Sequence, residues 1–153
     1  MNALHLTPLV FLCSACIVVV AGHHKEDHVH RQDAQSLFDG RTTHGWRGYK
    51  ETDCPAGWQV VDGALTRVGE AGDLVSLEEY GSFDFEFDWQ VAPGANSGVM
   101  FHVSEDHDAP WETGPEYQIL DNAAHKDGLD PRTSAAANYA MHAPLRDVTK
   151  PAG

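Results

Sequence analysis

The sequence predicts an all-β fold, a sandwich or jelly roll built from short antiparallel strands. Residues 83–91 alternate between Phe, Trp or Val and Asp, Glu or Gln, which is the period of a strand with one buried face. Two β-rich runs meet at Asp62-Gly63, a dipeptide typical of a two-residue hairpin turn. The chain keeps no sustained 3.6-residue apolar period, so strands rather than helices are expected to form the core.

The strands are expected to follow one another along a single domain that begins at Ser36. They are predicted at residues 58–61, 64–68, 73–77, 83–91, 99–103 and 117–120. Residues 122–140 read as a loop with at most one helical turn over 133–137. The chain stops at Gly153, directly after that loop, and the predicted strands alone would leave sheet edges open. We therefore expect a C-terminally truncated domain, residues 36–153, whose closing strands are missing.

The N-terminal segment is expected to direct export. Residues 1–22 are mostly apolar and end in Val19-Val20-Ala21, which fits a signal-peptidase cut after Ala21. Residues 23–35 are polar and rich in His, as in a solvated linker. Loss of the signal peptide leaves Cys54 alone, so no disulfide framework is expected. The protein is predicted to be periplasmic or secreted, with no membrane contact after cleavage; an uncleaved membrane anchor is the alternative.

The charge of the chain argues against a nucleic-acid partner. The formal net charge is −13, and Lys126 is the one Lys or Arg against fifteen acids between Glu70 and Asp130. A phosphate backbone would be repelled by such a surface. Most of these carboxylates read as a solvated acidic face, and a few of them could converge on a divalent cation. The oligomeric state is left open.

One stretch, Asn96 to Asp127, combines acids, amides and imidazoles with aromatic side chains. Glu116 and Gln118 are two residues apart on a predicted strand, so both point to the same face, and His125 lies on the loop beyond. The predicted metal ligands are Glu116, Gln118, Asp121 and His125. Carboxylate, amide oxygen and imidazole suit Ca²⁺, Mn²⁺ or Zn²⁺, and residue type does not choose among them.

The order of motifs resembles the 3-keto-disaccharide hydrolase domain family, and the resemblance covers essentially the whole chain from Ser36 on. The matching motifs are Leu37 to Gly40 with Gly45-Trp46, Trp58 to Leu65, Glu79 to Phe87, Asn96 to Phe101, Gly114 to Asn122, and Lys150 to Gly153. The resemblance implies a concanavalin-like antiparallel β-sandwich, found in exported bacterial proteins that act on 3-keto sugars. In that family the Lys-Pro-Ala-Gly stretch is followed by a Glu-Trp-Asn strand and further strands, which agrees with truncation here.

The chemistry that this resemblance implies is hydrolysis of a 3-keto-glycoside through elimination and hydration. A ketone at C3 acidifies the C2 proton, so the site needs a base with a near-neutral pKa and a group that holds the enolate oxygen. The candidate catalytic residues are Glu116, His125, His102 and Lys150, with Lys150 as the oxyanion partner. The candidate carbohydrate contacts are Trp111, Gln118 and Tyr139.

Two other functions compete with this one. A non-catalytic, lectin-like carbohydrate-binding module is the alternative, because the same fold serves binding and catalysis. A laminarinase-type glycosidase would need Glu-x-Asp-x-x-Glu on one strand. The chain has Glu86 and Asp88 in that spacing but Val91 in the place of the third acid, so this function is rejected.

Overall fold

The computed structural model describes residues 10–13, 17–20, 35–147 and 149–153. The strands are β1 (Val10–Cys13), β2 (Ile17–Val20), β3 (Trp46–Gly48), β4 (Trp58–Val61), β5 (Ala64–Arg67), β6 (Leu74–Ser76), β7 (Asp88–Val91), β8 (Asn96–Met100) and β9 (Glu116–Leu120). Within these residues the helical elements are two short 3₁₀ turns, η2 (Pro110–Glu112) and η3 (Lys126–Leu129). Among the described residues there is no α-helix, and none of the helical turns could cross a membrane. The mostly β fold is confirmed.

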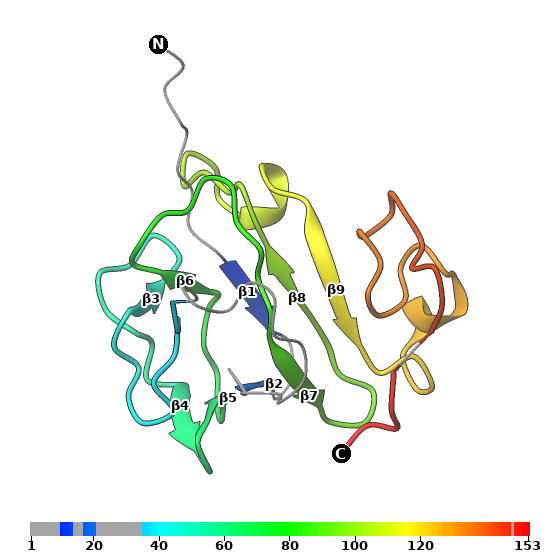
Figure 1. Ribbon diagram of the computed structural model, residues 1–153, viewed down its shortest axis with the longest axis horizontal. Coiled ribbons are helices and arrows are strands. Elements are labelled where there is room, and N and C mark those ends of the chain that lie inside the picture. The colour runs from blue at the N-terminus through cyan, green and yellow to red at the C-terminus, as the bar shows by residue number, and fades with distance from the viewer. Residues whose placement is uncertain (1–9, 14–16, 21–34, 148) are drawn as a thin grey trace.

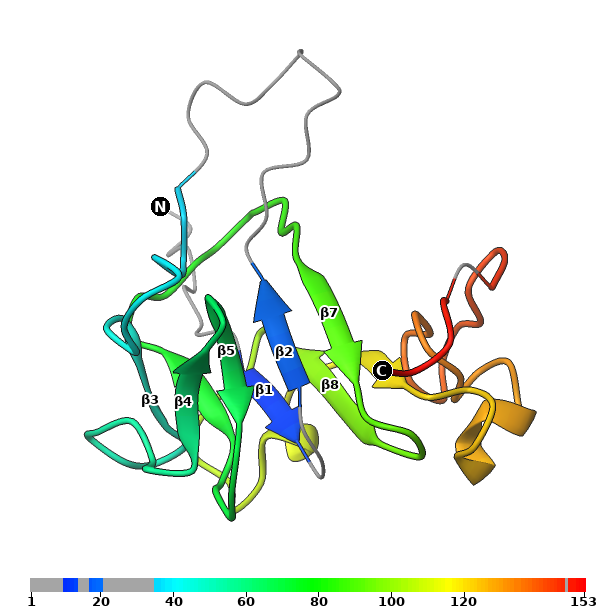
Figure 2. The same ribbon diagram turned by 90° about the horizontal axis from the view of Figure 1, so that it is seen from below.

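The strands form two small antiparallel sheets. The first has the order β3-β6-β1-β8-β9, and the second has the order β4-β5-β2-β7. Figure 1 shows β8 and β9 side by side, with the segment after β9 gathered beyond this edge of the sheet. Figure 2 shows the four strands of the second sheet. Every strand pairing is antiparallel, as expected.

Side chains from both sheets meet in one apolar cluster. Leu74, Val99 and Ile119 come from the five-stranded sheet, and Leu65 and Val91 come from the four-stranded sheet. All five side chains are buried. Burial of a side chain of this size is worth about 1.5–3 kcal/mol, so the cluster orients both sheets and determines which faces remain for polar residues.

The hairpin predicted at Asp62-Gly63 is confirmed. β4 and β5 pair from Trp58 opposite Arg67 to Val61 opposite Ala64. Asp62 and Gly63 have φ angles of 51° and 80°, and two residues with positive φ define the type I′ turn. This turn suits the right-handed twist of the paired strands, so the local sequence is sufficient to set the register.

Three predicted elements differ from the structure by more than one residue at an end. Residues 85–91 alternate in burial as predicted, whereas Phe83 is exposed, and the paired strand covers only Asp88–Val91, the residues opposite β2. The strand predicted over 99–103 ends at Met100, and His102 has a φ of 56°, which extended backbone does not allow. In the loop after β9 the helical turn forms at Lys126–Leu129 rather than at 133–137.

Two strands come from the segment that the sequence predicts to be a signal peptide. β1 and β2 occupy an inner place in each sheet. The predicted cut after Ala21 and residues 23–34 of the predicted linker lie outside the described residues, so export and cleavage stay predictions.

Candidate active site on the outer face of the five-stranded sheet

Strand β9 directs alternate residues to opposite sides, as the sequence predicts. Tyr117 packs its ring edge against Phe87, with 5.6 Å between ring centroids, and Ile119 is fully buried in the shared core. Glu116 and Gln118 therefore face the other side of the sheet, away from that core. This outer face is where the predicted acid and amide come together.

The Glu116 carboxyl lies over a residue without a side chain. Glu116 pairs with Met100, and Gly98 is two residues further along β8 on the same face. A methyl group on Gly98 would overlap the Oε1, Cδ and Cγ atoms of Glu116. Glycine at this position thus leaves the space in which the carboxyl lies.

Burial changes the acidity of this carboxyl. The pKa of Glu116 rises from 4.5 to about 7, first because burial penalises the charged form and second because Asp73 is negatively charged. A carboxyl group that is half ionised near neutral pH can both accept and return a proton. Glu116 therefore has the acid–base property that the predicted chemistry requires.

Asp73 is a second acid of this site, and sequence reasoning missed it. Leu74 and Val99 both pair with Phe11 and both enter the shared core, so the residues next to them, Asp73 and Gly98, face outward together. Burial raises the pKa of Asp73 from 3.8 to about 6, against the lowering effect of Arg67. The available signal is an acid directly before an apolar strand, and this pattern by itself indicates only the start of the strand.

The segment after the loop closes over the free edge of β9. Backbone hydrogen bonds join Ala136 N–H to Gln118 O at 2.8 Å and Tyr139 N–H to Glu116 O at 2.9 Å. Gln118 is 1% exposed, and its amide nitrogen donates to Thr133 O at 3.3 Å. Within the described part of the chain, the side-chain carbonyl oxygen of Gln118 accepts no hydrogen bond. Gln118 thus braces this segment against β9 and is not exposed to solvent.

Tyr139 is held beside Glu116 by a backbone hydrogen bond, and its side chain meets the acidic loop beyond β9. Burial raises the pKa of Tyr139, and the charges of Asp127 and Glu116 raise it further. The hydroxyl also shares a hydrogen bond with Asp127. A phenol kept protonated beside two carboxylates is a hydrogen-bond donor, so the structure brings the predicted sugar contact Tyr139 to the predicted base Glu116.

His125 and Asp121 shape the turn that follows β9. The Asp121 carboxylate accepts N–H groups from Gly94 at 2.8 Å and Ala123 at 3.0 Å, and these bonds, that from Gly94 first, lower its pKa. His125 Nδ1 accepts a hydrogen bond from the N–H of Asp127 at 3.2 Å, so Nε2 carries the proton of the neutral ring and is a donor. Both side chains have structural partners.

The predicted metal ligands do not converge in the part of the chain that the structure describes. No group of three or more His, Cys, Asp or Glu side chains there is placed to hold a metal ion. Asp121 uses its oxygens on backbone N–H groups, whereas Gln118 donates from its amide nitrogen to Thr133 and keeps its side-chain oxygen without a partner among the described residues. The metal centre therefore stays a prediction, and no chemical step is derived through it.

His102 lies beside two aromatic rings, and Lys150 lines a cavity on the other side of β9. His102 is exposed beside the rings of Phe83 and Phe101, at centroid distances of 6.2 and 5.7 Å. Lys150 lines a cavity of about 500 Å³ between β7, β9 and residues 149–153. Tyr117 also lines this cavity, which places it on the opposite side of β9 from Glu116.

Trp111 is presented to solvent by a braced loop that leads into β9. The side chain is 63% exposed on η2. The guanidinium of Arg47 donates to both oxygens of Glu105 at 2.7 Å, and the backbone N–H of Lys50 donates to Glu105 at 2.6 Å. Tyr49 adds a hydroxyl bond of 3.0 Å to the carbonyl of Ser104. These contacts tie the loop to the end of β3.

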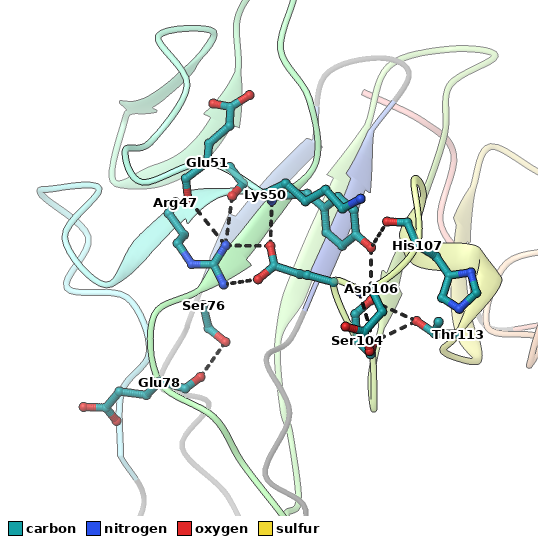
Figure 3. Close-up of polar contacts among 12 residues, drawn as sticks. Arg47, Lys50, Glu51, Ser76, Glu78, Ser104, Asp106, His107 and Thr113 are labelled. Atoms are coloured by element: carbon teal, nitrogen blue, oxygen red, sulfur yellow. Dashed lines mark hydrogen bonds and ion pairs between the residues drawn. The ribbon is translucent and has the colours of Figure 1, made fainter.

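Figure 3 shows Arg47 and Lys50 facing the loop residues Ser104, Asp106 and His107. An exposed indole on an anchored loop is a rigid apolar surface on which a sugar ring can stack. The structure thus supports Trp111 as a contact surface without placing it against the Glu116 carboxyl.

Comparison with known proteins identifies the family. The model of the 3-keto-alpha-glucoside-1,2-lyase-like domain matches residues 33–153. The 3-keto-disaccharide hydrolase of Bacteroides thetaiotaomicron is 32% identical over 140 residues, which cover 77% of this chain and 48% of that protein. A crystal structure from Parabacteroides distasonis, provisionally described as a glycosyl hydrolase, is 36% identical with a TM-score of 0.70 and covers 76% of this chain and 58% of that one.

The chain thus spans about half the length of these relatives. The resemblance read from the motifs is confirmed, and the matched region contains every described strand from β3 to β9. The chain belongs to the 3-keto-alpha-glucoside-1,2-lyase-like domain family.

Proposed function

We propose that this protein cleaves 3-keto-glycosides by removing the C2 proton, with Glu116 as the base. The observation that carries the proposal is a half-buried carboxyl with a pKa of about 7, positioned over Gly98 on the outer face of the sheet. A related protein named 3-keto-disaccharide hydrolase supports the substrate class. An acid with an ordinary pKa would be a weaker base toward a carbon acid at neutral pH.

The reaction conserves atoms and protons through two stages. Glu116 takes the proton from C2 as the ketone at C3 accepts the electron pair as an enolate. The enolate then expels the group on C1, and the departing oxygen takes a proton from a water molecule. The hydroxide that this water leaves adds to C1 of the C1–C2 double bond, and Glu116 returns its proton to C2. The net result is hydrolysis of the glycosidic bond.

Two neighbours suit supporting roles in this reaction. Tyr139 keeps its proton at neutral pH, because its pKa is raised by burial and by nearby carboxylates, and its hydroxyl can shift its one hydrogen bond from Asp127 to the enolate oxygen when the sugar is bound. Asp73 keeps Glu116 basic through its negative charge. Trp111 offers a stacking surface for a sugar ring. Such a site belongs to a concanavalin-like antiparallel sandwich, in which the two sheets enclose the shared core.

The test is turnover of a 3-keto-disaccharide by the full chain, followed as release of the reducing sugar. Glu116→Gln should lower kcat/KM by a factor of at least 100, whereas the exposed carboxylate variant Glu70→Gln should retain activity. In the parent chain kcat/KM should rise with pH through about 7, as Glu116 ionises. Binding of the sugar without turnover would assign the chain to the lectin-like alternative instead.

A further inference from the structure

A second apolar cluster lies on the outer face of the five-stranded sheet, next to Glu116. Met100 is directly opposite Glu116 in the β8–β9 pairing, so the two side chains share this face. Val75, which follows a core residue in β6, also points outward. Both are buried, Val103 completes this outer cluster, and Tyr49 packs against it. The chain after β8 therefore folds back over the outer face and forms a wall beside Glu116.

This wall is a loop, residues 103–113, whose two ends are held together. Thr113 Oγ1 accepts a hydrogen bond from the N–H of Ser104 at 3.0 Å (Figure 3). Within the loop, the carboxylate of Glu112 accepts the N–H of Ala109 at 3.0 Å and fixes the turn of η2. Figure 1 shows η2, the coil in this loop, at the end of the sheet where β9 begins. The exposed indole on η2 is therefore presented from a closed loop beside the candidate base.

Tyr49 joins this loop to the strands that carry the acids of the site. Its hydroxyl lies 3.0 Å from the carbonyl oxygens of both Ser104 and His107, so one phenol holds the first turn of the loop. Its ring packs against the outer cluster. Its backbone N–H donates to the carbonyl of Asp73 at 2.9 Å. A single residue thus contacts the loop, the apolar side chains beneath the loop, and the second acid.

We propose that Trp111 and residues 103–113 bind the sugar ring that leaves from C1, and that Tyr49 is the positioning residue of this subsite. The inference rests on the proposed function, which puts the reacting ring at Glu116. The neighbouring wall is then available to the other ring of a disaccharide. The indole is 63% exposed and suits the apolar face of a sugar ring. Because this ring is remote from C2, its binding should lower KM more than it raises kcat.

Tyr49→Phe tests the positioning role in the full chain. The variant keeps the ring in place but loses the hydroxyl that holds Ser104 and His107. KM for a 3-keto-disaccharide should rise by about 3- to 10-fold, with kcat changed by less than about 2-fold. The rise should be smaller with a methyl 3-keto-glycoside, which has no second ring. Tyr80→Phe, which removes a hydroxyl bonded to the exposed Glu78 at 3.2 Å, is the matched control and should leave both constants unchanged.

Equilibrium binding separates this subsite from the reaction. In chains that carry Glu116→Gln, calorimetry gives the Kd of the 3-keto-disaccharide for Trp111→Ala, Tyr49→Phe and the double variant. Trp111→Ala should weaken binding by about 3- to 10-fold, and Tyr49→Phe should add little to this loss, because Tyr49 acts through the indole. Such coupling would support the subsite even if the parent chain showed no turnover, which would refute only the proposed reaction. Additive losses, a fall in kcat as large as the rise in KM, or an equal rise in KM with the methyl glycoside would overturn the subsite.

Discussion

At the scale of single residues, the outer face of the five-stranded sheet concentrates two carboxyl groups whose charged forms are disfavoured. The pKa of Glu116 is raised to about 7 and that of Asp73 to about 6, in both cases chiefly by burial. A functional base therefore costs stability where it is ionised. The group that the proposed reaction needs in its charged form is the group that the fold prefers in its neutral form.

We expect the free energy of unfolding to fall as Glu116 ionises. The folded-state pKa lies above the unfolded value of 4.5, so the stabilising effect of the protonated group is complete below pH 4.5 and is lost as pH rises through about 7. Glu116→Gln removes this loss. The unfolding free energy of the variant minus that of the parent chain should therefore rise by on the order of 2–3 kcal/mol between pH 4.5 and pH 8. Urea unfolding of both chains at both pH values measures this change. The same difference between variant and parent at pH 4.5 and at pH 8 would contradict the prediction.

A substitution at Gly98 should change the position of the Glu116 carboxyl without much change in the stability of the fold. In Gly98→Ala the new methyl group would displace the carboxyl of Glu116, which is the movable end of a side chain. The unfolding free energy should change by less than about 1 kcal/mol, whereas kcat/KM should fall by about 10- to 100-fold because the base is misplaced. Gly72→Ala, where a methyl group meets no atom within 4 Å, is the control. A loss of stability without a loss of turnover would sink the idea.

At the scale of secondary-structure elements, the sequence predicted strands wherever a local signal determined them. The Asp62-Gly63 turn and the alternation around Tyr117 are local, and both appear in the structure. The extent of the strand before Val91 depended on a partner, β2, that no local pattern indicated. Asp73 reached the site only through the strand order, which sequence spacing does not reveal. Pairing between strands distant in the sequence thus determines the length of β7 and the place of Asp73, which local patterns do not reveal.

The loop that carries Trp111 depends on one bidentate ion pair. Lys cannot reproduce the two parallel bonds from Arg47 to Glu105, each 2.7 Å long, between side chains that are only 19% and 28% exposed. Arg47→Lys should therefore destabilise the fold by about 1–2 kcal/mol in chemical denaturation. Arg132→Lys alters the more exposed ion pair with Asp130 and should lower the free energy of unfolding by less than about 0.5 kcal/mol. Equal losses in the two variants would refute a special role for Arg47.

At the scale of the whole molecule, the net charge of −13 makes self-repulsion a general cost of folding. Raising NaCl from about 0.05 M to about 0.5 M should raise the midpoint of thermal unfolding, because salt screens the repulsion between the carboxylates. The Debye length falls from about 10 Å at 0.1 M to about 3 Å at 1 M.

Asp121 and Gln118 have protein partners, and no metal-holding group of His, Cys, Asp or Glu occurs among the described residues. The predicted metal centre is tested by comparing Ca²⁺, Mn²⁺ and Zn²⁺ with Mg²⁺ at matched ionic strength. A metal-specific rise in the midpoint, abolished by EDTA and by His125→Ala, would support it, because an ion that binds only the folded state stabilises it by mass action, and equal midpoints with all four ions would contradict it.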